Sequence, residues 1–144
     1  MNFEEISRLI ENSLTGLKVD PVACRGEKKG QWSLKIKDST VWIDAFNFES
    51  KPDVYYFQVM SPLFAVPETQ NSEIMTDLLE FAYSMYGCSV CKKANWYYAL
   101  SLREAEGLDQ KEVDLIIDRI GHYSSDIYAK FSFKYASALA PKQG

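Results

Sequence analysis

Two cysteines stand three positions apart in the segment Gly-Cys-Ser-Val-Cys, at Cys88 and Cys91. A C-x-x-C pair could be a redox centre or half of a zinc site, since both need closely spaced thiolates. A redox pair gains reactivity at a helix N-terminus, but this pair follows the expected end of a helix, where the neutral thiol is favoured. On a strand the two side chains would face opposite sides. We therefore expect buried structural cysteines, with no metal and no cofactor.

Only two other residues could join these cysteines in a site, Cys24 and His122, and neither has the spacing of a zinc ligand. His122 lies four residues from both Asp118 and Asp126, so on a helix it could pair with either at the surface. A histidine with a positioned partner can be a general base, but we favour a solvated helix histidine. The alternative is a metal- or small-molecule-responsive regulator, which would use Cys24, Cys88, Cys91 and His122.

Acidic residues gather around the expected start of the last helix: Glu104, Glu106, Asp109, Glu112 and Asp114. Paired carboxylates can perform acid–base catalysis, but a helix N-terminus favours acidic residues for electrostatic reasons alone. The chain has no Gly-rich phosphate loop, no G-x-S-x-G and no H-E-x-x-H motif. We predict that the protein is not an enzyme. An enzyme that uses these carboxylates stays as a further alternative, which a deep pocket lined by them would support.

The 144 residues suit a single domain, which we place at residues 1–135, followed by a short tail at 136–144. A net charge of −4 argues against a nucleic-acid partner. The first residues include acidic ones, whereas a signal peptide begins with basic residues. No apolar stretch approaches the ~20 residues of a membrane span. Three cysteines, an odd number, suit a reducing compartment. We expect a cytoplasmic protein with no membrane partner.

The spacing of apolar residues predicts an α+β domain in the order α-β-β-β-α-β-β-α. A first helix follows Asn2, which forms a capping-box pattern with Glu5, and ends at Gly16. Alternation predicts strands over 32–37, 40–48 and 54–61, joined as an antiparallel meander. Residues 63–66 read as an irregular crossing between two prolines. The remaining elements are a helix capped by Asn71 or Ser72 and ended at residue 87, strands over 89–93 and 96–103, and a long helix over 110–131.

Both faces of the expected twisted sheet are apolar. Val41, Ile43 and Ala45 alternate with a second set that contains Trp42 and Phe46. The first and last helices should cover one face, with the middle helix towards the sheet edge. The other face is either covered by the same chain or exposed to a partner. If it is exposed, its candidate binding residues are Trp42, Phe46, Phe48 and Tyr56.

The middle helix carries apolar residues outside its main stripe, at Met75, Leu79 and Tyr86. A stable interface needs such residues at its core, and about 1,600 Å² of buried surface in total. Together with the two apolar sheet faces, these residues predict a homodimer.

The stretch from Met60 to Phe131 resembles a known family in its apolar pattern. It contains MSPLFAVP, then EIMTDLLEFAYSMYGCSVCKK, then WYYALSLREAEGLDQKEVDLIIDRIGHYSSDIYAKF. These segments look like the YbjN-like family of bacterial sensory transduction regulators, over roughly residues 24 to 131. The C-x-x-C and the Lys-Lys-Ala-Asn turn at 92–95 depart from the family pattern. The resemblance implies a fold like that of type III secretion chaperones. It also implies a non-enzymatic cytosolic protein-binding module, chaperone-like or regulatory, whose client it does not identify.

Overall fold

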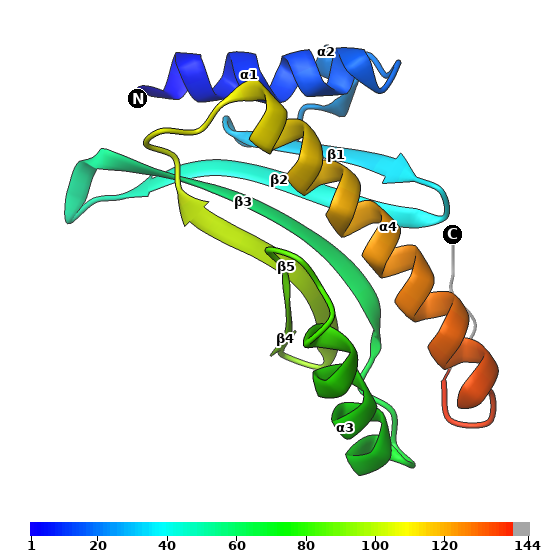
Figure 1. Ribbon diagram of the computed structural model, residues 1–144. Coiled ribbons are helices and arrows are strands. Elements are labelled where there is room, and N and C mark those ends of the chain that lie inside the picture. The colour runs from blue at the N-terminus through cyan, green and yellow to red at the C-terminus, as the bar shows by residue number, and fades with distance from the viewer. Residues whose placement is uncertain (140–144) are drawn as a thin grey trace.

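The computed structural model describes residues 1–139, which form four helices and five strands (Figure 1). In chain order the elements are α1 (Phe3–Gly16), α2 (Pro21–Cys24), β1 (Gln31–Ile36), β2 (Ser39–Phe48), β3 (Lys51–Ala65), α3 (Asn71–Ala82), β4 (Ser89–Lys93), β5 (Trp96–Glu104) and α4 (Gln110–Lys134). The α+β class and the predicted order are confirmed. The sequence prediction lacks only α2, because a helix of one turn is too short to show an apolar periodicity.

The five strands form one antiparallel sheet in the order β1-β2-β3-β5-β4. Helix α4 runs across one face of this sheet and contacts β1, β2, β3 and β5 (Figure 1). Helix α1 packs against α4 and β2, and α3 lies beside the edge strand β4. We call the side covered by α1 and α4 the helix face, and the other side the open face. No helix within residues 1–139 is long and apolar enough to cross a membrane.

The two predicted capping boxes define where the long helices begin. The Asn2 side chain accepts a hydrogen bond from the Glu5 amide at 2.8 Å, and the Glu5 carboxylate accepts one from the Asn2 amide at 3.0 Å. Asp109 and Glu112 make the same reciprocal pair at the start of α4. Each pair satisfies two amides that the first helical turn leaves without a partner.

Helix α3 differs from its prediction at both ends. Gln70, in the left-handed region with φ 61°, precedes the helix and makes no side-chain cap. Asn71 is not the cap, because its side chain instead accepts a hydrogen bond from the Tyr97 hydroxyl at 2.6 Å. The helix ends at Ala82 rather than near residue 87, yet Met85 in the following turns is still buried.

The predicted irregular crossing at 63–66 is wrong, because β3 continues to Ala65. Pro62 has no amide hydrogen to donate, and a register shift between Pro62 and Phe64 accommodates it. Leu63 and Phe64 are both buried. The shift therefore breaks the alternation of buried and exposed residues on which the sequence prediction rests.

Small residues allow α4 to lie close to the sheet. A Cβ atom at Gly121 would lie 2.7 Å from carbons of the Ile36 side chain, closer than van der Waals contact allows. One turn further on, the Ser61 hydroxyl donates a hydrogen bond to the Ser124 hydroxyl at 2.7 Å. The helix face is thus closed by tight packing in which this buried polar pair is satisfied.

The chain after α4 begins to pack against the domain. Leu139 is buried, and its amide donates a hydrogen bond to the Tyr135 carbonyl at 3.0 Å. The boundary at residue 135 stays a prediction. Residues 140–144 of the predicted tail lie outside the described residues.

Candidate partner-binding surfaces

The open face presents aromatic and aliphatic side chains from three adjacent strands. Because residues opposite each other on antiparallel strands share a face, the pairs Trp42–Met60 and Phe46–Tyr56 both point away from α1 and α4. Strand β5 extends the face with Leu102, which is 50% exposed. The helices of residues 1–139 therefore leave one of the two predicted apolar faces uncovered.

The four residues that the sequence singles out for binding all lie on the open face, in two groups. Phe46 and Tyr56 stack with ring centroids 5.5 Å apart, and Phe48 packs edge-on against Tyr56 at 5.2 Å. Trp42 lies nearer the start of β2, and its ring centroid is 6.1 Å from that of Tyr98. Trp42 is 38% exposed and Phe48 is 52% exposed. Tyr98 is the partner that sequence reasoning misses, since it comes from β5.

A cavity of about 460 Å³ lies beside Trp42 on this face. Its lining includes Gln31 and Ser33 of β1 and Lys93 at the end of β4, so it extends between the two edge strands of the sheet. Asp44 also lines it and is half-buried. Burial raises the pKa of the Asp44 carboxyl, and side-chain contacts with Gln31 and Gln58 act in the opposite direction.

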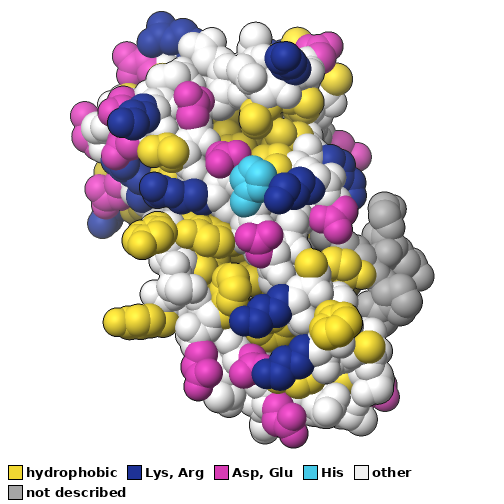
Figure 2. Space-filling model, turned by 45° about the vertical axis from the view of Figure 1, so that its right-hand side comes forward, with side chains coloured by type: hydrophobic (Ala, Val, Ile, Leu, Met, Phe, Trp, Pro, Cys, Tyr) yellow, Lys and Arg dark blue, Asp and Glu magenta, His cyan; other side chains and the backbone are white. Residues whose placement is uncertain are grey.

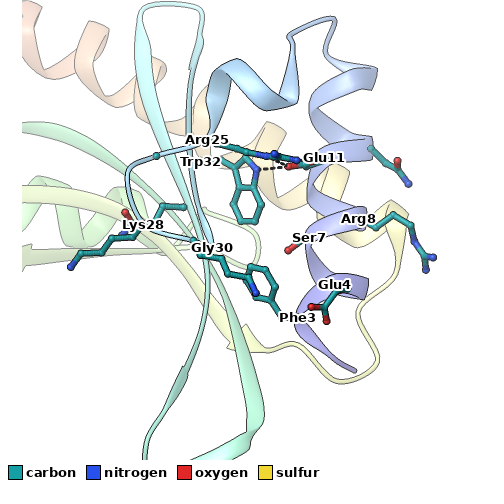
Figure 3. A pocket seen from close by; sticks show the side chains of 13 residues that line it. Phe3, Glu4, Ser7, Arg8, Glu11, Arg25, Lys28, Gly30 and Trp32 are labelled. Carbon is teal, nitrogen blue, oxygen red and sulfur yellow. Dashed lines mark hydrogen bonds and ion pairs between the residues drawn. The ribbon is translucent and has the colours of Figure 1, made fainter.

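A second cavity, of about 540 Å³, lies between α1 and the start of β1 (Figure 3). Phe3 and Ser7 of α1 face it on one side, and Gly30 and Trp32 on the other. Gly30 has φ 88°, and a Cβ atom there would lie 2.4 Å from the carbonyl oxygen of Ala45. Only glycine fits at this position. That contact fixes how closely the loop before β1 approaches β2.

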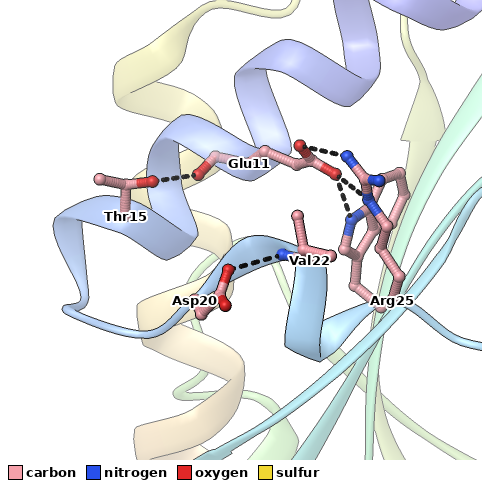
Figure 4. A network of polar contacts seen from close by, with 6 residues as sticks. Glu11, Thr15, Asp20, Val22 and Arg25 are labelled. Atoms are coloured by element: carbon pink, nitrogen blue, oxygen red, sulfur yellow. Dashed lines mark hydrogen bonds and ion pairs between the residues drawn. The ribbon is translucent and has the colours of Figure 1, made fainter.

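The Glu11 carboxylate holds the wall of this second cavity together (Figure 4). It accepts hydrogen bonds from Arg25 Nε at 2.7 Å and from Trp32 Nε1 at 3.1 Å. The hydrogen bond from Arg25, with a smaller contribution from Trp32, lowers the pKa of Glu11. Nearby, Asp20 caps α2 through the Val22 amide at 3.0 Å. Sequence reasoning misses this network because its members come from separate elements.

Helix α3 and the turns that follow it expose large apolar side chains. Met75, Leu79 and Tyr86, the residues predicted for a dimer interface, are all exposed, and Tyr83 joins them. Leu79 is 65% exposed. In the lower half of Figure 2, at the height of α3 and the end of α4 in Figure 1, hydrophobic side chains interrupt the charged surface. We call Met75, Leu79, Tyr83 and Tyr86 the α3 patch.

The cysteines do not converge on a site within residues 1–139. Cys24 ends α2, Cys88 precedes β4 and Cys91 lies on β4, and all three are free. Each is half-buried rather than buried as predicted, because β4 is an edge strand and α2 lies at the surface. Burial raises the pKa of all three thiols, which favours the protonated form. No group of three metal-ligating side chains occurs among the described residues.

His122 and two of the acidic residues around the start of α4 form separate ion pairs. His122 Nε2 lies 3.0 Å from an Asp118 carboxylate oxygen on the helix surface. Glu106 pairs with the terminal amine of Met1 at 2.7 Å, and Glu112 with Arg103 at 3.2 Å. The two cavities that contain Glu112 and Asp114 each include only one member of the acidic cluster. Asp109 and Glu112 cap α4, Glu106 and Glu112 make ion pairs, and Asp114 accepts hydrogen bonds from Ser13 and Gln110.

No family model and no curated protein sequence matches this chain, so the YbjN-like resemblance gains no support from them. Solved structures do match it. One belongs to the HopA1–SchA chaperone–effector complex, with 9% identity, a TM-score of 0.62, and coverage of 90% of this chain and 98% of the other. Another belongs to the ExoU–SpcU complex of the Pseudomonas aeruginosa type III secretion system, with 13% identity, a TM-score of 0.59, and coverage of 83% and 95%.

A third match is the structure of the Yersinia pestis type III secretion chaperone SycH with a fragment of YscM2. It has 12% identity and a TM-score of 0.56, and the alignment covers 84% of this chain and 98% of the other. At such identities the likeness concerns the fold. The element order, the antiparallel sheet and these matches agree, and the chain has the fold of type III secretion chaperones.

Proposed function

We propose that this protein is a non-enzymatic cytoplasmic protein-binding module of the chaperone-like or regulatory kind. It would bind a segment of a partner protein on its open face. The observation that carries the proposal is the uncovered sheet face with Trp42, Phe46, Phe48 and Tyr56. The matched structures support it, since HopA1–SchA is described as a chaperone–effector complex. A regulator of the YbjN-like kind is the narrower form of the same proposal.

The chemistry of the open face suits an extended protein segment. Tryptophan and tyrosine supply large contact areas at modest entropic cost, and interface hot spots are enriched in both. Trp42 and the ring cluster of Phe46, Phe48 and Tyr56 lie along β2 and β3, so one segment could contact both groups. The edge strands β1 and β4 could add backbone pairing.

Replacement of Trp42 tests the proposal. We expect Trp42→Ala to weaken partner capture by about 2 kcal/mol or more, as truncation of an interface hot spot does. The matched control is Phe133→Ala, which removes a ring that is 89% exposed on α4, away from the sheet. The assay is a pull-down from the native host with mass-spectrometric identification, together with a thermal melt of each variant.

Two outcomes would contradict this role of Trp42. If Trp42→Ala melts far below the wild type, the ring supports the core rather than a binding surface. If Trp42→Ala melts normally and captures the same proteins as Phe133→Ala, the partner binds elsewhere.

We further propose that the protein is a homodimer and that the α3 patch forms the centre of its interface. The patch carries four large exposed apolar side chains, and two of them, Met75 and Leu79, stand on α3 where a solvated helix would carry polar residues. A second copy could cover them, because the patch lies outside the open face and leaves it accessible.

A charge in the α3 patch should separate the subunits. Leu79→Glu places a carboxylate at a site that is 65% exposed in the single chain, so the monomer should still fold. We expect the wild type to elute at twice the 16.5 kDa chain mass and the variant at the chain mass, measured by light scattering coupled to size exclusion. A wild type that is monomeric at every accessible concentration would refute the dimer.

A further inference from the structure

A single carboxylate interrupts the aromatic row of the open face. On β2, Asp44 lies between Trp42 and Phe46 on the same face. Its two cross-strand neighbours, Gln31 and Gln58, are uncharged. No ion pair links Asp44 to another residue of the described chain, and no described cation contributes to the pKa shift of its carboxyl. The carboxylate is half-buried, so its charge is only partly solvated.

The cavity that contains Asp44 has walls that attract a cation. Trp42 and Tyr98 both line it, and their ring planes meet at 45° with centroids 6.1 Å apart. The faces of such rings carry partial negative charge. Met60 adds a polarisable thioether to the same wall. A carboxylate beside two aromatic rings thus provides electrostatic attraction and stacking surfaces for one positively charged group.

We infer that this cavity is a socket for a basic side chain, arginine or lysine, of the partner segment that binds the open face. The inference rests on the proposed function, and it specifies the chemistry of the segment. Arginine suits the site better than lysine, because its planar guanidinium can stack on the Trp42 ring and hydrogen-bond to the Asp44 carboxylate with two donors. The net charge of −4 would attract a basic segment over a longer range.

Lys93 is the other charged residue that lines the cavity, and it suggests an alternative in which the occupant is acidic. If the occupant were an acidic side chain, Lys93 would bind it and Asp44 would repel it. Asp44 is half-buried between neighbouring strands, while Lys93 is exposed at the end of β4 and can turn into solvent. The geometry therefore favours Asp44 as the group that selects the charge of the occupant.

Small amino-acid amides can probe the socket in the full chain. Acetyl-arginine amide, acetyl-lysine amide, neutral acetyl-norleucine amide and acetyl-glutamate amide are titrated while the Trp42 indole N–H signal is followed by NMR. The Trp42→Ala variant identifies that signal among those of the three tryptophans. We expect the arginine amide to shift the signal most, the lysine amide less, and the other two little. Added salt should weaken the binding of the basic probes.

Two variants decide which charged residue carries the selectivity. Asp44→Asn keeps the shape of the side chain and should weaken arginine-amide binding about fivefold, as for a partly exposed charge pair. Lys93→Ala should leave that binding unchanged or strengthen it. The inference is wrong if norleucine amide shifts the signal as much as arginine amide, or if Asp44→Asn binds arginine amide as the wild type does. It is also wrong if glutamate amide binds best and Lys93→Ala abolishes its binding.

Partner capture separates failure of the socket from failure of the proposed function. If Trp42→Ala loses the partner and Asp44→Asn retains it with wild-type affinity, the open face binds the partner without using the socket. The inference is then wrong, and the proposed function is still supported. If both variants retain the partner fully, the proposed binding face is wrong and the inference falls with it. If both variants lose the partner while their melts are normal, the proposed function and the inference are both supported.

Discussion

The apolar residues that β2 directs to the two faces of the sheet are of different kinds. On β2, Val41 and Ile43 point to the helix face and are fully buried. Trp42 and Phe46, between and beside them, point to the open face and keep part of their rings in solvent. Compact branched residues suit a surface that the small residues of α4 must approach closely. Wide rings beside a carboxylate suit a surface that must attract another molecule.

Apolar alternation alone does not reveal which face of a sheet will be covered by helices of the same chain. The informative feature is the helix that must cover it. Gly121 and Ser124 of α4 match the compact residues of the helix face. The described helices provide no such complementary row for Trp42 and Tyr98. We interpret the difference between the faces as a division between folding and binding.

The largest expected effect is on the helix face. Ile43→Ala removes a fully buried side chain and should lower the free energy of unfolding by about 2–5 kcal/mol, through lost burial and the cavity left behind. Trp42→Ala, at the adjacent position on β2, should cost clearly less because its ring is partly exposed. Urea melts of the two variants measure the difference. Equal losses would show that the open face is as much a core as the helix face.

A smaller effect concerns Asp44 and pH. Burial raises the pKa of its carboxyl in the folded state above the unfolded value, so the folded state binds this proton more tightly. The ionised carboxylate therefore costs stability, and this cost grows as pH rises from the ordinary aspartate pKa through the raised one. Asp44→Asn removes the ionisation. We expect the variant to melt slightly above the wild type at pH 7 and to lose this advantage below pH 4.

Thermal melts of the wild type and Asp44→Asn across the acidic pH range test the direction of this effect. Lys93 is the other charged residue that lines the cavity, and it is present in both proteins. A variant that melts below the wild type at pH 7 would mean that the ionised Asp44 stabilises the fold. The hydrogen bonds from Gln31 and Gln58 would then outweigh the cost of burying the charge.

The sequence predicts those parts of the fold that depend on local patterns. The capping boxes at Asn2 and Asp109 form as expected, and alternation places β1 and β2 within one residue of their observed bounds. The prediction fails where contacts between residues distant in the sequence determine the bounds of an element. The Pro62 register shift lets β3 continue, and the bond from Tyr97 to Asn71 takes the predicted cap away from α3.

The same limit applies to the candidate site. Trp42, Phe46, Phe48 and Tyr56 come from adjacent strands, so alternation alone places them on one face. Tyr98 cannot be assigned to Trp42 without the β3–β5 pairing, which joins strands separated by a helix and an edge strand. The cavity around Asp44 is invisible in sequence for this reason.

Our proposal that a partner protein lies on the open face can be tested by site-specific photo-crosslinking. A photoreactive phenylalanine analogue replaces Phe48, which is 52% exposed on the open face, or Phe133 on α4 as the control position. We predict that irradiation in the native host gives a discrete adduct with a single partner protein from position 48 and none from position 133. An adduct from position 133 alone, with none from position 48 in a protein that still captures its partner, would contradict the claim.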